Sequence, residues 1–185
     1  MDLPDLGVAV TALGCAVAAA LGFFAWGFVE YLVHGILGHR YRTFVTPLHG
    51  GHHIEPRAVF TSPLGWVPIA GLLWAVAALT AGPLFGSCFF AALLAGFLRY
   101  EYVHWRIHFR TPKTPRQRLL HQHHLAHHFV NAKAYHGVTT RLWDRVFGTL
   151  PETRAADYAR VCSVAPLAGG SNLAAIWHPR TMLGP

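Results

Sequence analysis

The sequence predicts an all-α integral membrane protein, and three observations support this fold class. Only 12% of the 185 residues are charged, whereas a soluble domain usually carries about 25%. Two long stretches contain no charged residue, and the mean hydropathy of the chain is +0.33. Ten of the 14 histidines fall into four tight clusters beside these stretches. Membrane helices that support a polar, histidine-rich layer would explain all three observations.

The first uncharged stretch predicts a transmembrane helix over residues 7–29. It runs from Gly7 to Val29 without a charge. A helix rises about 1.5 Å per residue, so this length can cross a hydrocarbon core of about 30 Å. No basic segment precedes it, as a signal peptide would require, and we therefore expect a retained span.

The second uncharged stretch, residues 61–98, is too long for one crossing. Gly82 and Pro83 interrupt it, which predicts a helical hairpin with spans at 64–81 and 83–100. Ser62 and Pro63 provide an N-cap and a first-turn proline for the first of these helices. The alternative is a buried helical pair of a soluble protein.

Charge predicts the orientation of the three spans within a single membrane domain, residues 1–185. All 15 Lys and Arg residues follow Gly35, while Asp2 and Asp5 are the charges before the first span. By the positive-inside rule the N-terminus lies outside, and the histidine-cluster segments 30–60 and 101–150 form a cytoplasmic helical cap. The Arg-rich, Lys-poor composition hints at a bacterial inner membrane. No nucleic-acid motif accompanies the basic residues, so we expect no nucleic-acid partner.

The histidine clusters have the spacing of metal ligands. On a helix, residues three or four apart share a face, so the histidines of each of three clusters should point in one direction. These clusters are His104 with His108, His49 with His52 and His53, and His124 with His127 and His128. Imidazole is a common metal ligand, whereas the alternative is a set of structural or surface histidines. Ten ligands are too many for one ion and suit two. The candidate ligands are His34, His39, His49, His52, His53, His104, His108, His124, His127 and His128.

Two clusters also predict local structure. His34 and His39 are five residues apart and cannot share one α-helical face, so we expect the helix to unwind at Gly38 and to turn both rings inward. Thr114 to Gln117 resembles a capping box, which predicts a helix running through His128. Gly50 and Gly51 predict close approach of a neighbouring helix.

Other polar residues near the clusters are weaker candidates. His121, His123 and His136 could contribute additional ligands. Four carboxylates could orient imidazoles by hydrogen bonding, as metal-bound histidines usually require, or could be ordinary salt-bridge partners. These carboxylates are Glu30, Glu55, Glu101 and Asp144. Residue type alone does not select the metal, because imidazole suits Fe, Cu, Ni and Zn.

The motifs resemble the fatty acid hydroxylase / sterol desaturase superfamily, and the fatty acid 2-hydroxylase branch most closely. The resemblance rests on HGGHH at 49–53, YEYVHWRIHF at 100–109, HLAHHF at 124–129 and GVTTRLWDRVFGT at 137–149. It implies an oxidoreductase of lipid metabolism that uses two Fe ions and O2 to hydroxylate a fatty acyl chain at C2. Zinc can replace iron in such a site when the protein is purified.

The same resemblance implies an external electron donor. No cytochrome b5 domain is fused to the matching segment, so we expect a separate carrier, a ferredoxin or cytochrome b5 with its reductase. A carotenoid or sterol hydroxylase or desaturase of the superfamily is the nearest alternative. A zinc-dependent membrane hydrolase, or a metal-binding protein without oxidative chemistry, is the alternative from another class.

Overall fold

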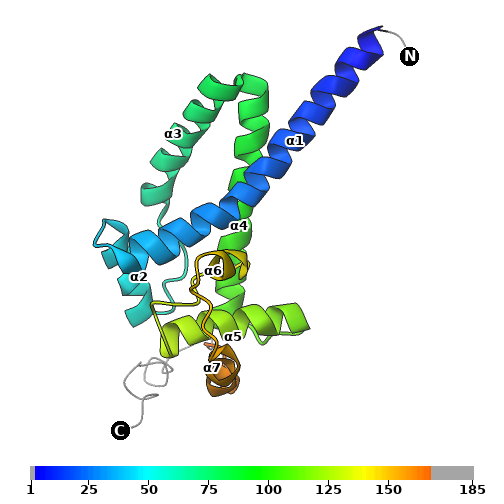
Figure 1. The fold of residues 1–185 in the computed structure, drawn as a ribbon. Helices are drawn as coiled ribbons and strands as arrows, with labels where there is room; N and C mark the ends of the chain where they lie inside the picture. Colours follow the sequence, from blue (N-terminus) through cyan, green and yellow to red (C-terminus); the bar gives the residue numbers. More distant parts are fainter. Residues whose placement is uncertain (1–2, 168–185) are drawn as a thin grey trace. The chain divides into compact units, whose positions relative to one another are not determined.

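The computed structural model describes residues 3–167, which are helical without a strand in that range. The helices follow one another along the chain in Figure 1. Their bounds are α1 Leu3–Tyr31, a π-helix η1 Leu32–Arg40, α2 Val45–Ile54, α3 Pro63–Ala81, α4 Pro83–Phe109, α5 Pro115–Phe129, α6 Leu142–Val146 and α7 Arg154–Val161. The described residues divide into a hairpin unit, residues 3–27 and 61–99, and a histidine unit, residues 28–60 and 100–167.

Residues 3–167 include three helices that are long and apolar enough to cross a membrane, as predicted. They are Asp5–Arg40, Pro63–Ala81 and Pro83–Phe109. Large apolar side chains on these helices are exposed, including Leu64 at 90% and Leu79 at 86%, which is the surface that lipid would cover. The first and third of these helices continue past the predicted membrane spans, which end at residues 29 and 100, and they carry histidines of the clusters there.

Small residues let the helices of the hairpin unit approach closely. A Cβ at Gly86 would lie 2.4 Å from the carbonyl oxygen of Ala77, and one at Gly22 would lie 2.0 Å from that of Phe89. Neither position therefore accepts a side chain without a shift of the backbone. Gly82 joins α3 to α4 with a φ of +80°, a conformation that glycine adopts freely.

The prediction that the first helix unwinds at Gly38 is wrong. The helix widens into the π-helix η1 and stays hydrogen-bonded to its end, where the Tyr41 amide donates to the Ile36 carbonyl five residues back. In a π-helix each backbone hydrogen bond joins two residues that are five positions apart. The five-residue spacing that does not suit an α-helix therefore brings His34 and His39 to one side, with ring centroids 5.7 Å apart.

Helix α5 forms as predicted and ends at Phe129, just after its last histidine. The Thr114 side chain caps it by accepting from the Gln117 amide at 3.2 Å. Gln117 does not complete a reciprocal box, because its side-chain oxygen accepts from the Lys113 amide instead. The prediction for Gly50 and Gly51 is wrong, since nothing lies within 4 Å of a Cβ built at either residue.

The core of the histidine unit lies around the buried face of α5, which packs against α7 (Figure 1). Leu125 and Ala126 are fully buried there, together with Tyr135 and Val138 of the following loop. The unit thus combines an apolar core with a polar side. That polar side carries the histidines of α5 toward those of η1, α2 and α4.

Candidate metal centre

The structure gathers the ten cluster histidines into two groups of five. In each group, one nitrogen from every histidine lies within 4.8 Å of the others. The first histidine group contains His34, His39, His49, His53 and His127, and the second contains His52, His104, His108, His124 and His128. Helices α2 and α5 contribute to both groups, whereas η1 supplies only the first and α4 only the second.

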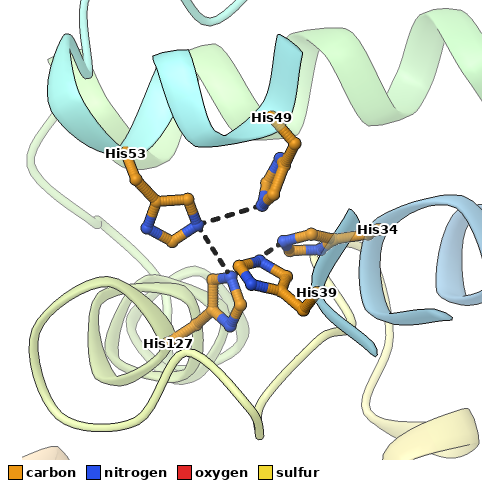
Figure 2. A group of neighbouring side chains, drawn as sticks. All are labelled: His34, His39, His49, His53 and His127. Carbon is orange, nitrogen blue, oxygen red and sulfur yellow. Dashed lines mark hydrogen bonds between the residues drawn. The ribbon is translucent and has the colours of Figure 1, made fainter. Parts of the chain in front are cut away.

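The rings of the first histidine group point toward one another from three elements (Figure 2). The Nε2 atom of His53 lies 2.9 Å from that of His49 and 3.1 Å from that of His127. His34 approaches His127 in the same way, with 3.0 Å between their Nε2 atoms. These short distances join η1, α2 and α5 at one point.

The second histidine group converges on His124 of α5. Its Nε2 atom lies 3.0 to 3.1 Å from the Nε2 atoms of His104, His108 and His128. His52 joins through His104, with 3.0 Å between their Nε2 atoms. One nitrogen of a neutral imidazole carries either one proton or one in-plane lone pair, so it cannot form three hydrogen bonds at once. Hydrogen bonding alone therefore does not account for the cluster.

Burial keeps these imidazoles neutral. It lowers the pKa of His52 to about 4 and, with help from neighbouring histidines, that of His53 to about 3. Burial, followed by the proximity of other histidines, also holds the pKa of His124, His127 and His128 well below the usual value. Neutral rings present the lone pairs that metal ions require, so the protonation state of both groups suits metal binding.

His34 and His127 provide the clearest test of whether a metal fits. Their Nδ1 atoms donate to the carbonyls of His136 and Ala134, which can only accept. Each Nε2 atom therefore carries a lone pair, and two lone pairs 3.0 Å apart repel unless a cation lies between them. Two nitrogens bound to one ion at about 2.0–2.1 Å and at right angles lie about 2.9 Å apart. The donor set thus fits a metal.

Comparison with known proteins supports the same interpretation of the histidine clusters. The family model described as fatty acid hydroxylase matches residues 19–149, which include all ten cluster histidines. The chain belongs to the fatty acid hydroxylase family. This membership agrees with the resemblance that the four histidine motifs indicated.

This hydroxylase-family chain is similar to curated proteins of plants and animals. It is 34% identical over 167 residues to the dihydroceramide fatty acyl 2-hydroxylase FAH2 of Arabidopsis thaliana, covering 84% of this chain and 66% of the relative. It is 34% identical over 143 residues to the human fatty acid 2-hydroxylase, covering 70% of this chain and 38% of the relative. The chain therefore spans less than two thirds of either relative.

A solved structure shows the same fold. It is described as full-length scs7p with only the hydroxylase domain visible, and it matches with a TM-score of 0.65 and 24% identity. The match covers 89% of this chain and 67% of that chain. The curated relatives named here come from eukaryotes, so they give no support to the bacterial source suggested by composition.

Two of the four carboxylates singled out from the sequence hold one loop of this hydroxylase-family chain. Asp144 accepts from the amides of His136 and Gly137, each at 2.8 Å. Glu30 accepts from the next two amides, those of Val138 and Thr139, at 2.6 and 2.9 Å. Four consecutive amides thus donate to two buried carboxylates. We call residues 134–139 the carbonyl loop, because it also supplies the carbonyls that accept from His34 and His127.

The other two carboxylates lie differently. Glu55 is exposed, and its side chain accepts from the Arg57 amide at 3.3 Å. Glu101 is buried at 8% exposure on α4.

Burial raises the pKa of Asp144, but hydrogen bonds from His123, Thr149 and Gly137 outweigh this effect and lower the pKa overall. Asp144 is therefore an ionised acceptor at neutral pH.

The three additional histidines lie outside both groups. His121 is buried on α5, and burial lowers its pKa. His123 joins Asp144 at 3.0 Å through Nε2 and the Tyr158 hydroxyl at 2.7 Å through Nδ1. The ring of His136 lies beside the first histidine group, 5.4 Å from that of His127 between centroids. Its ring also stacks on that of His39, with 5.7 Å between centroids, and its carbonyl accepts from Nδ1 of His34.

Sequence reasoning missed the backbone acceptors. Besides the carbonyls of Ala134 and His136, the Val59 carbonyl lies 3.2 Å from Nδ1 of His104. These three contacts orient imidazoles in both groups, as hydrogen bonds around metal sites usually do. Every residue has a carbonyl, so no residue type could have marked these positions before the fold was known.

Proposed function

We propose that this chain is a membrane-bound, O2-dependent hydroxylase that acts at C2 of a fatty acyl chain, with one iron ion in each histidine group. The single observation that carries the metal centre is the contact between the His34 and His127 Nε2 atoms, whose lone pairs require a cation. The plant and human relatives are named as 2-hydroxylases of fatty acyl chains or fatty acids, which supports acyl C2 as the target. They favour it over a carotenoid, a sterol or a hydrolysed substrate.

The residues of the chain have defined tasks in this proposal. When bound, an iron pair supplies the redox chemistry with O2 that can oxidise an unactivated C–H bond. The ten imidazoles hold the ions as neutral ligands. The carbonyl loop orients His34 and His127, and Val59 orients His104. Burial of His104, His108 and His124 excludes water from the second group, which limits side reactions.

We further propose that the histidine unit faces the cytoplasm and receives electrons there from an acidic carrier. All Lys and Arg residues follow Gly35, and by the positive-inside rule this supports a cytoplasmic location for this part of the chain. Arg110, Lys113, Arg116 and Arg118 are exposed around the start of α5. Such a cationic surface would steer an acidic ferredoxin or cytochrome b5 toward helix α5, which contributes ligands to both groups.

The test uses the full chain purified in detergent and loaded with iron. We expect about two iron ions per chain, and O2 consumption with a reductant and an acyl substrate such as a ceramide. Mass spectrometry should locate the new hydroxyl at C2. Hydroxylation of a carotenoid, or hydrolysis without O2 uptake, would contradict the proposed reaction. Absence of bound metal in a folded protein would contradict the centre itself.

A further inference from the structure

The carbonyl loop connects a buried carboxylate to one histidine group through a single peptide plane. The Gly137 amide donates to Asp144 Oδ2 at 2.8 Å, and the His136 carbonyl of the same peptide accepts from His34 Nδ1. A peptide unit is planar and trans, so its N–H and C=O point in opposite directions. The Asp144 carboxylate and the His34 ring therefore lie at the two ends of one rigid, polarisable group.

This geometry affects the donor strength of His34. A carboxylate that accepts from an amide polarises the peptide and makes its carbonyl a stronger acceptor. A stronger acceptor at Nδ1–H raises the electron density at Nε2, as carboxylate–histidine pairs do in metal sites. Here the carboxylate acts one peptide further away. The His136 amide also donates to Asp144, at 2.8 Å, so the peptide groups on both sides of His136 are hydrogen-bonded to this carboxylate.

Asp144 is kept ionised and fixed by two further contacts. Thr149 Oγ1 donates to it at 2.7 Å, and His123 Nε2 lies 3.0 Å away. Its side chain is fully buried. Loss of its charge would therefore leave several donors facing a weaker acceptor, and the peptide between residues 136 and 137 would lose its orientation.

The second group has a different arrangement. The two imidazoles that donate to the carbonyl loop, His34 and His127, both belong to the first histidine group. In the second group His104 contacts the Val59 carbonyl, which lies in the segment before α3. Through the carbonyl loop, the hydrogen bonds of Asp144 therefore extend to ligands of the first histidine group and not equally to those of the second.

We propose that Asp144 is a positioning residue that sets the metal affinity of the first histidine group through the His136–Gly137 peptide. The inference rests on the proposed metal centre and adds a selective control of one of its two positions. Removal of the Asp144 charge weakens metal binding in the first group by about 10- to 100-fold, the usual effect of removing a hydrogen-bond partner of a ligand. The second group keeps its metal.

The experiment compares iron and cobalt stoichiometry in purified full-length wild type and Asp144→Asn during titration with a chelator. Wild type should hold two ions per chain, and the variant should keep one under conditions that leave wild type fully loaded. The absorption spectrum of the cobalt form should match that of His34→Ala, which lacks a ligand of the first group. Asp144→Ser, which leaves space for a water molecule to accept from the amides, should behave in the same way.

Asp157→Asn is the matched control. Asp157 is also buried and accepts from the Tyr135 hydroxyl in the carbonyl loop, but it does not contact the peptide between residues 136 and 137. This variant should hold two ions. Equal loss in Asp157→Asn and Asp144→Asn would overturn the proposal, as would loss of both ions together or failure of both Asp144 variants to fold. Wild type without metal would instead contradict the proposed function.

Discussion

The first and second histidine groups use the same ligand type but differ in burial and support. In the first group His39, His49 and His53 are only half-buried, whereas in the second His104, His108 and His124 are at most 2% exposed. The first group depends on a loop that two carboxylates hold, and the second depends mainly on helices α4 and α5. Similar histidine motifs have thus produced one accessible position and one enclosed position.

This difference suggests a division of tasks within the proposed dimetal centre. Four of the five ligands of the enclosed group lie on α4 and α5, helices whose backbone is satisfied internally. The accessible group relies on the π-helix η1 and on the carbonyl loop, whose amides donate to Asp144 and Glu30. We therefore expect the two metal positions to differ in exchange rate and in their response to mutation.

The largest effect is expected for His128→Ala. His128 Nε2 lies 3.0 Å from His124 Nε2 in the second group, so its loss should remove one metal and abolish hydroxylation. Membrane insertion should be unchanged, because the apolar helices that insert are untouched. The measurements are metal content, product formation and membrane fractionation.

The matched control for this variant is His121→Ala. His121 is a buried histidine of the same helix that lies outside both groups. It should keep two metals and measurable activity. An active His128→Ala protein with full metal content would show that His128 is not a ligand.

A second prediction concerns metal exchange. A hydrophilic chelator should remove metal in two phases, with the half-buried first group emptied first. His128→Ala, with only the first position loaded, should show the fast phase, and His127→Ala should show the slow one. Time-resolved metal release measures both. A single phase in wild type, or the reverse assignment, would remove the distinction between the groups.

A third prediction tests the electron donor, which should serve both positions alike. Arg116→Glu combined with Arg118→Glu should slow turnover with an acidic protein donor by about tenfold at low salt. Turnover with a small chemical reductant should not change. Arg154→Glu with Arg160→Glu makes the same charge change on exposed residues of α7. If both double variants slow the reaction equally, the net charge of the protein explains the slower turnover, and docking of the donor near α5 does not.

The smallest effect is expected for Thr114→Ala, which removes the side-chain cap of α5. Loss of such a cap costs about 1 kcal/mol, which lowers Tm by about 2–4 °C in a chain of this size. Both metals should remain, because the candidate ligands on α5 lie far along the helix from its capped end. Thermal unfolding and metal analysis test this, with the exposed Thr80→Ala of α3 as control. Selective loss of one metal would show that metal binding in the two groups depends to different degrees on the stability of α5.

Much of the fold followed from local patterns. Long uncharged stretches indicated the three apolar helices, and Thr114 with Pro115 marked the start of α5. The end of the first helix was not predictable in this way, because a π-helix has no composition signal. The five-residue spacing of His34 and His39 was a signal that α-helical reasoning took for an interruption.

The sequence by itself determined which residues gather, and it predicted that they bind metal. Histidine spacing indicated the ten imidazoles that come together, and the apolar stretches indicated the three long apolar helices beside them. The tertiary structure alone decided how the ten divide, since each HxxHH motif is shared: His52 and His127 leave their neighbours for the other group. It also decided which carbonyls hold the rings. Histidines four residues apart, such as His49 and His53, stay in one group because they share a helical face. Which group the third histidine of each motif joins, and which carbonyl holds each ring, depends on how separate helices face one another.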